Sequence, residues 1–220
     1  MSEKLRLRFA KEGRAIYISH LDLMRTMQRA FQRAGLSLKY SEGFNPHPIL
    51  SILLPLSVGM QSVCELMDFQ LTAEEDLSSM SEKLTEAMPE GIRVLEVYPE
   101  GRKVKELKWL RVSGALEYDA ADLQTVRNGL QEFFAKESIV IRKKTKRGEG
   151  ESDIAPAIRS IGFQAEERCV ALSAVISAQE PTLNPELLVS ALSQLAPQLA
   201  PDFAEFTRLE VYDAAMKVFR

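Results

Sequence analysis

The order in which strand-like and helix-like patterns follow one another restricts the fold of this chain more than any other feature. Residues 4–10, KLRLRFA, alternate charged and apolar side chains, which predicts a half-buried strand. Residues 20–35 carry apolar side chains three and four positions apart, which predicts an amphipathic helix. Two strands, a second helix and a further strand are then predicted at residues 48–60, 63–71, 73–89 and 92–99.

The same order returns after a charged linker at residues 99–106. The β-α-β-β-α-β order is that of the ferredoxin-like unit. We therefore predict an α+β fold of tandem ferredoxin-like (βαββαβ) units with antiparallel sheets, in domains spanning residues 1–100 and 107–220. In the second domain residues 153–164 are predicted to be an insertion between the middle strands, and the six elements are predicted at residues 109–118, 120–137, 138–146, 169–178, 185–196 and 206–215.

The predicted helices begin and end with residues that helix ends favour. Ser19 can cap the first helix, Asp22 suits the positive end of its dipole, and Gly35 can stop it. Residues 74–76, EED, are predicted to occupy the first turn of the second helix. The predicted buried face of the first helix consists of Leu23, Met27, Ala30, Phe31 and Ala34.

Three arginines recur every fourth residue on the first predicted helix, at Arg25, Arg29 and Arg33. At a rise of about 1.5 Å per residue they step along the helix by about 6 Å, which suits a row of phosphates or carboxylates. Gln28 and Gln32 flank the row, and no acidic residue lies between Arg25 and Lys39. This is a candidate binding surface for an anion; the alternative is an ordinary solvated helix face.

Residues 40–48, YSEGFNPHP, combine a flexible residue with stiff ones. Gly43 permits a positive φ, while Pro46 and Pro48 fix their own φ and restrict the residue before each, so His47 is held in place. Ordering a residue in advance lowers the entropy cost of binding, which favours a functional loop over a plain crossover. The candidate binding residues here are Ser41, Glu42, Gly43, Phe44, Asn45 and His47.

His20 stands at the start of the first helix, two residues before Asp22. The helix dipole disfavours a positive charge there, so a neutral imidazole could accept a proton or donate one hydrogen bond. A cap or packing role is the alternative. We include His20 and Asp22 among the candidate binding residues.

A basic run follows in the second half, RKKTKRGEG at residues 142–150, which we predict to be a hairpin tip. Such an arm could contact phosphate backbones, with an affinity that falls steeply as salt is added. The alternative is a solubilising loop. The candidate binding residues of this arm are Arg142, Lys143, Lys144, Lys146 and Arg147.

The net charge of -3 hides a segregation of charge. Residues 1–50 hold nine lysines and arginines against four acidic residues, and residues 101–150 hold twelve against seven, whereas the other two segments are acidic. Nucleic-acid-binding proteins are usually basic overall, so the negative net charge argues against nucleic-acid binding. A basic patch is nevertheless sufficient for contact with a nucleic acid.

The residue patterns of common cofactor enzymes are missing. The chain has two histidines and two cysteines, and Cys64 and Cys169 lack the paired spacing of a metal or cluster site, so we expect reduced core residues. It has no phosphate-cradling glycine loop, dinucleotide fingerprint or nucleophile elbow. We expect no cofactor and no metal. No signal peptide precedes the first residues, and the apolar run at 49–60 is too short to cross a bilayer, so we expect a cytoplasmic protein without a membrane partner.

The segments IYISHLDLMRTMQRA, LKYSEGFNPHPILSILLPLSVGMQS and CELMDFQL resemble the radical-SAM-linked bacterial proteins of family DUF2344. The match is close over residues 3–100 and looser afterwards, where SDIAPAIRSI and FTRLEVY resemble its later landmarks. The resemblance implies a partner, a radical SAM enzyme with a B12-binding domain, and a genomic context near ribonuclease G and ribosomal proteins. The chain lacks the three-cysteine motif that such an enzyme needs for its cluster.

These observations favour a noncatalytic accessory module that binds RNA or a ribosome-associated partner for a radical SAM enzyme. An alternative is a metal-independent endoribonuclease similar to the ferredoxin-like CRISPR RNA-processing enzymes, with His20 or His47 as the base and Tyr17 in support. A second alternative is a protein-interaction scaffold without nucleic acid, in which the acidic segment 65–100 would matter equally.

Overall fold

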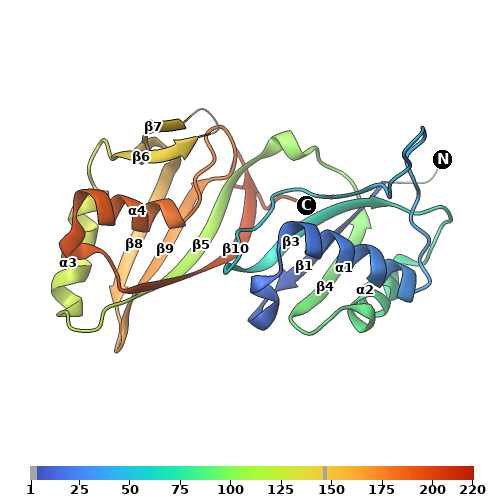
Figure 1. Ribbon diagram of the computed structural model, residues 1–220, viewed down its shortest axis with the longest axis horizontal. Coiled ribbons are helices and arrows are strands. Elements are labelled where there is room, and N and C mark those ends of the chain that lie inside the picture. Colours follow the sequence, from blue (N-terminus) through green and yellow to red (C-terminus); the bar gives the residue numbers. More distant parts are fainter. Residues whose placement is uncertain (1–3, 146–147) are drawn as a thin grey trace. The chain divides into compact units, whose positions relative to one another are not determined.

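The computed structural model describes residues 4–145 and 148–220, apart from the side chains of Lys144, Thr145 and Glu149 (Figure 1). It separates into two compact units. The amino-terminal unit ends at Glu106 and also includes Phe219 and Arg220, and the second unit spans Leu107–Val218.

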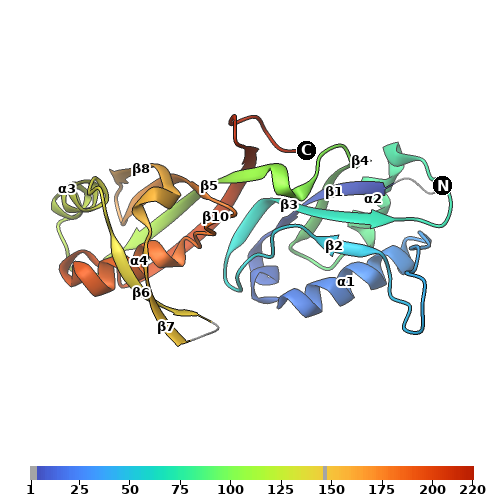
Figure 2. The same cartoon turned by 90° about the horizontal axis from the view of Figure 1, so that it is seen from above.

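The amino-terminal unit is a sheet covered by two helices. Its strands lie in the order β4-β1-β3-β2, with antiparallel pairing throughout. Figures 1 and 2 show α1 and α2 on the same face of this sheet. A short 3-10 turn at Gly13–Tyr17 leads into α1, and the elements in chain order are β1 (Lys4–Lys11), α1 (His20–Arg33), β2 (Leu50–Ile52), β3 (Gln61–Gln70), α2 (Leu77–Ala87) and β4 (Ile92–Pro99).

The core of this unit lies between the sheet and the helices. Leu7 and Phe9 of β1 are fully buried, as are Met27 and Phe31 of α1. The Phe31 ring packs on Phe69 of β3, with 4.8 Å between ring centroids. Each such side chain stabilises the fold by about 1.5–3 kcal/mol through burial alone. The predicted apolar face of α1 is confirmed, since Leu23 and Ala30 are buried as well.

The half-buried character predicted for β1 is wrong, because Arg6 and Ala10 of its other face are also buried, and so is the charged Lys11 at its end. Arg6 has no exposed surface, since Phe219 and the connection after β4 fold over it; its guanidinium lies 5.1 Å from the centroid of the Phe219 ring. Lys11 is buried too, and its ammonium donates to the carbonyls of Ile16 and Ile18 at 3.1 and 3.0 Å. Burial lowers the pKa of Lys11.

Two element boundaries in this unit differ from the prediction. The strand predicted at residues 48–60 is only β2, Leu50–Ile52, because Pro55 cannot donate a ladder hydrogen bond and Gly59 turns the chain at a positive φ of 90°. The helix predicted from residue 73 begins at Leu77. Asp76 caps it by accepting the amide hydrogen of Ser78 at 3.0 Å, so Glu74 and Glu75 precede the helix.

The second unit has a main sheet in the order β10-β5-β9-β8, and β6 and β7 form a separate two-stranded sheet. The described pairings in it are antiparallel. Its elements are β5 (Leu107–Glu117), α3 (Leu123–Phe134), β6 (Val140–Thr145), β7 (Gly148–Asp153), β8 (Ile158–Ala165), β9 (Cys169–Ser177), α4 (Glu186–Leu195) and β10 (Phe203–Asp213). The prediction of an α+β fold with antiparallel pairing is confirmed.

One strand of the main sheet in the second unit was predicted to be an insertion. The strand predicted at 138–146 exists as β6, but it pairs with β7 outside the main sheet, and the sheet strand is β8, inside the predicted insertion. The reason is the run of three basic residues from Arg142, which leaves β6 without an alternating apolar face. By contrast, Phe163 of β8 is buried and stacks on Phe134 of α3 at 5.6 Å.

The two cysteines are both free thiols, but only Cys64 is a core residue. Cys169, at the start of β9, is half-buried, which corrects the sequence-based expectation. Burial and the neighbouring Glu166 carboxylate raise the pKa of the Cys169 thiol. No helix within the described ranges is long and apolar enough to span a membrane.

Candidate functional site

The start of α1 is organised as the sequence predicts. The Ser19 hydroxyl caps the helix by accepting the amide hydrogen of Asp22 at 3.2 Å, and it donates to the Asp22 carboxylate at 2.8 Å. The hydrogen bond from Ser19 and the contact with Arg25 hold the pKa of Asp22 below its ordinary value. His20 is the first helical residue, and it is exposed.

The three arginines of α1 do not form one uniform row. Arg25 donates to Asp22 at 3.0 Å, one turn earlier, so an acidic residue of the same helix offsets it. Arg33 donates through Nε to the carbonyl oxygen of Ala87 at the end of α2, at 3.1 Å. Among the described residues, Arg29 makes no hydrogen bond or ion pair, and it is exposed. Only Arg29 therefore offers a guanidinium that is not already engaged.

The loop after α1 is closed by contacts between Ser41 and His47. The Ser41 amide donates to the His47 carbonyl at 2.8 Å, and the His47 amide donates to the Ser41 hydroxyl at 3.1 Å. The same hydroxyl lies 2.9 Å from Nδ1 of the imidazole, which fixes the ring. The loop extends away from the sheet (Figure 2). Between its closing residues, Glu42, Asn45 and Phe44 are exposed, Phe44 completely, and Gly43 has a φ of 122°.

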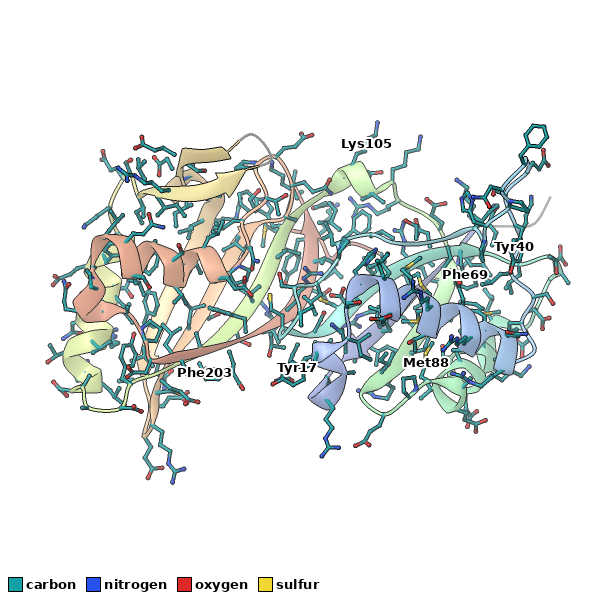
Figure 3. All side chains as sticks on the ribbon, in the orientation of Figure 1. Tyr17, Tyr40, Phe69, Met88, Lys105 and Phe203 are labelled. Atoms are coloured by element: carbon teal, nitrogen blue, oxygen red, sulfur yellow. The ribbon has the colours of Figure 1, made fainter. Side chains whose placement is uncertain are left out.

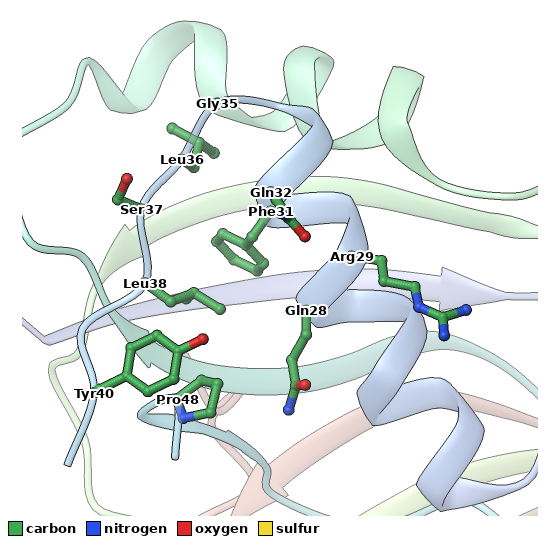
Figure 4. Close-up of a pocket in the computed structure, with 10 residues that line it drawn as sticks. All are labelled: Gln28, Arg29, Phe31, Gln32, Gly35, Leu36, Ser37, Leu38, Tyr40 and Pro48. Atoms are coloured by element: carbon green, nitrogen blue, oxygen red, sulfur yellow. The ribbon is translucent and has the colours of Figure 1, made fainter. Parts of the chain in front are cut away.

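A hollow lies between the second half of α1 and the strand-like segment that follows it. Its volume is about 420 Å³. In Figure 4, Tyr40 and Pro48 lie side by side on one rim, Gln28 points toward them from α1, and the Arg29 side chain extends from the other side of the helix, away from them. We call this the α1 hollow; it is lined by Gln28, Arg29, Phe31, Gln32, Gly35, Leu36, Ser37, Leu38, Tyr40 and Pro48.

The two histidines are not brought together by α1. His20 begins the helix, whereas Gln32 of the α1 hollow lies about 18 Å further along its axis, at about 1.5 Å per residue. His47 directly precedes Pro48 of the hollow. Figure 3 likewise places Tyr17 near the amino end of α1 and Tyr40 at the opposite end. His20 and Tyr17 therefore do not line the α1 hollow.

The basic arm belongs to the β6–β7 hairpin of the second unit. The side chain of Gln194 on α4 holds the backbone of Arg142, accepting from its amide at 2.9 Å and donating to its carbonyl at 3.0 Å. Arg142 is exposed and Lys143 is half-buried. The candidate residues Lys146 and Arg147, and the side chain of Lys144, lie outside the described residues.

Sequence reasoning missed the aromatic and apolar parts of the α1 hollow. Tyr40 is 55% exposed, and Leu36 and Leu38 of the same segment also line the hollow. The signal was present, because LSLKY alternates like a strand directly after Gly35. An alternation over five residues is too short to distinguish a strand from loop sequence.

The α1 hollow combines polar and apolar groups. The side-chain amides of Gln28 and Gln32 and the ring of Tyr40 line it together with buried apolar residues, and Arg29 lies on the same helix as the two glutamines. Such a combination can hold a planar group and an anion together. In the described part of the chain, no group of three or more His, Cys, Asp or Glu side chains is arranged to hold a metal ion.

Sequence comparison places residues 4–185 in a protein family, DUF2344, described as uncharacterised and conserved in bacteria. The chain belongs to this family. No curated protein matches this chain.

Several solved structures are similar to this DUF2344 chain at low identity. A chain of a Cbf5-Nop10-Gar1 complex is 13% identical with a TM-score of 0.46, over 94% of this chain and 48% of that one, so this chain spans about half of its length. An unknown protein from Galdieria sulphuraria is 8% identical with a TM-score of 0.28, over 94% and 99% of the two chains. Thermus thermophilus Cse3, bound to an RNA representing a pre-cleavage complex, is 14% identical with a TM-score of 0.20, over 92% and 98%. These scores are too low to imply a shared function.

Proposed function

We propose that this chain is a noncatalytic binding module that holds RNA on its amino-terminal unit. The observation that carries the proposal is the exposed Tyr40 ring beside the α1 hollow, together with the unengaged Arg29 of α1, whose side chain extends outward from that helix (Figure 4). Cationic groups bind the phosphate backbone, and aromatic rings stack on unpaired bases. The exposed loop from Ser41 to His47 would extend this surface.

The resemblance to radical-SAM-linked proteins adds a second part to the proposal. The partner would be a radical SAM enzyme with a B12-binding domain, which performs the chemistry in the cytoplasm while this chain positions the substrate. A chain with two cysteines cannot by itself hold an iron–sulfur cluster that needs three cysteine ligands. Its composition is therefore consistent with a separate enzyme that carries the cluster. The two units would be variants of one ferredoxin-like fold, the second enlarged by the β6–β7 hairpin.

Comparison of two neighbouring arginines tests the RNA-binding proposal. Arg29→Ala is expected to weaken binding of a labelled single-stranded RNA several-fold and to reduce the slope of log affinity against log salt by about 0.7, the value for one phosphate contact. Arg25→Ala is the matched control, because Arg25 is already paired with Asp22 on the same helix. Fluorescence anisotropy at several salt concentrations measures both quantities. Equal effects of the two substitutions, or no RNA binding by the native protein, would contradict the proposal.

A further inference from the structure

We propose that the α1 hollow takes a single unpaired nucleotide, with the base against Tyr40 and the adjoining phosphate at Arg29. This inference rests on the proposed RNA-binding function and names the part of an RNA that the site recognises. It follows from the size of the hollow, from the way Tyr40 is held, and from the unengaged polar groups around it.

The size and floor of the hollow suit one base. At about 420 Å³ it falls within the range of small-molecule sites, about 300–1,000 Å³. Phe31 and Leu36 are buried and make an apolar floor, against which a flat aromatic ring can lie. A paired base in a duplex could not reach this floor, since its faces are covered by its neighbours in the stack.

The backbone that carries the Tyr40 ring is held from both sides. Tyr40 forms an antiparallel bridge with Pro48, and the preceding residue, Lys39, donates to Gln70 and accepts from Ile49, both at 2.8 Å. The ring nevertheless remains 55% exposed. An exposed ring on an ordered backbone suits a stacking platform, because little backbone entropy is lost when a base lies on it.

Two amides stand where the edge of a base would lie. Gln28 and Gln32 are one turn apart on α1, and both line the hollow (Figure 4). Each side-chain amide has donors and an acceptor, and neither has a side-chain hydrogen bond to another described residue. They can therefore pair with the edge of a base. The Arg29 side chain extends from the side of α1 that faces away from Tyr40 (Figure 4), so the phosphate bound there would lie outside the hollow, where the sugar–phosphate chain passes over the helix.

Short single-stranded RNAs with and without bases test the inference. The probes are labelled oligoribonucleotides of equal length, one of uridines and one with abasic riboses, each titrated into the full chain by fluorescence anisotropy. Tyr40→Ala is expected to weaken binding of the uridine oligomer about tenfold and to leave the abasic oligomer unchanged. Arg29→Ala should weaken both. Tyr17→Ala, which removes an exposed ring at the other end of α1, should weaken neither.

The possible outcomes separate this inference from the function on which it rests. If Arg29→Ala weakens both oligomers but Tyr40→Ala changes neither, RNA binding stands and the nucleotide pocket is wrong. Equal losses for both oligomers in Tyr40→Ala would also overturn the pocket, because they would indicate a general structural effect. If neither oligomer binds the native protein, both proposals fail. Replacing Gln28 and Gln32 with alanine should in addition reduce the preference among oligomers of different bases.

Discussion

Asp68→Ala is expected to lower the free energy of unfolding by about 3–5 kcal/mol, because it removes the nearer of the two carboxylates that neutralise a buried guanidinium. Asp68 stands directly opposite Arg6 in the β1–β3 register, and Nε of Arg6 donates to it at 2.6 Å. The Arg6 side chain has no exposed surface, and its other carboxylate neighbour, Glu100, is 3.8 Å away. Urea denaturation followed by circular dichroism measures the change.

Lys4→Met is the control for this prediction. Lys4 lies on the same strand and faces Glu100 at 3.9 Å, but its side chain is 67% exposed. Exposed pairs of this kind contribute about 0–1 kcal/mol, so the variant should differ little from the native protein. A loss in Asp68→Ala no greater than that in Lys4→Met would mean that Arg6 does not depend on Asp68.

Gly91→Ala is expected to destabilise the amino-terminal unit by about 2–5 kcal/mol through two additive causes. The residue has a φ of 87°, which costs an alanine about 1–2 kcal/mol. The new methyl group would also collide with the carbonyl oxygen of Glu12 and approach Cβ of Ala15 to 2.9 Å, and such overpacking costs about 1–3 kcal/mol. The carbonyl oxygen of Glu12 cannot shift away easily, because the amide of the same residue donates to the Gly91 carbonyl at 2.8 Å.

Gly59→Ala separates the two causes. Gly59 has nearly the same φ, 90°, but an added methyl group there meets nothing within 4 Å. It should therefore show only the backbone cost of about 1–2 kcal/mol. Thermal unfolding of both variants gives the comparison. If the two lose equal stability, the collision at Glu12 is absent in solution.

Features that depend on neighbouring residues were predictable from the sequence. The cap at Ser19, the buried face of α1 and the stop at Gly35 each follow from residues within one or two turns of helix. The alternation in residues 4–10 correctly predicted a strand. What it could not predict is the burial of Arg6, because the ring that covers it belongs to Phe219, far away along the chain.

The candidate site was predictable only in part, for the same reason. The row of arginines was visible, but its members differ in their partners: Asp22 engages Arg25, while the end of α2 engages Arg33. That second contact depends on how two helices pack, which no local pattern contains. Grouping His20 with His47 likewise required a tertiary arrangement, and α1 itself separates His20 from the hollow.

Photocrosslinking tests the central claim, that RNA lies in the α1 hollow, most directly. A single-stranded RNA containing 4-thiouridine is irradiated with the native protein, and the crosslinked peptides are identified by mass spectrometry. The account predicts crosslinks within residues 28–48, centred on Tyr40, which disappear when unlabelled RNA competes. Crosslinks confined to the second unit, or to the start of α1 around Tyr17 and His20, would contradict it.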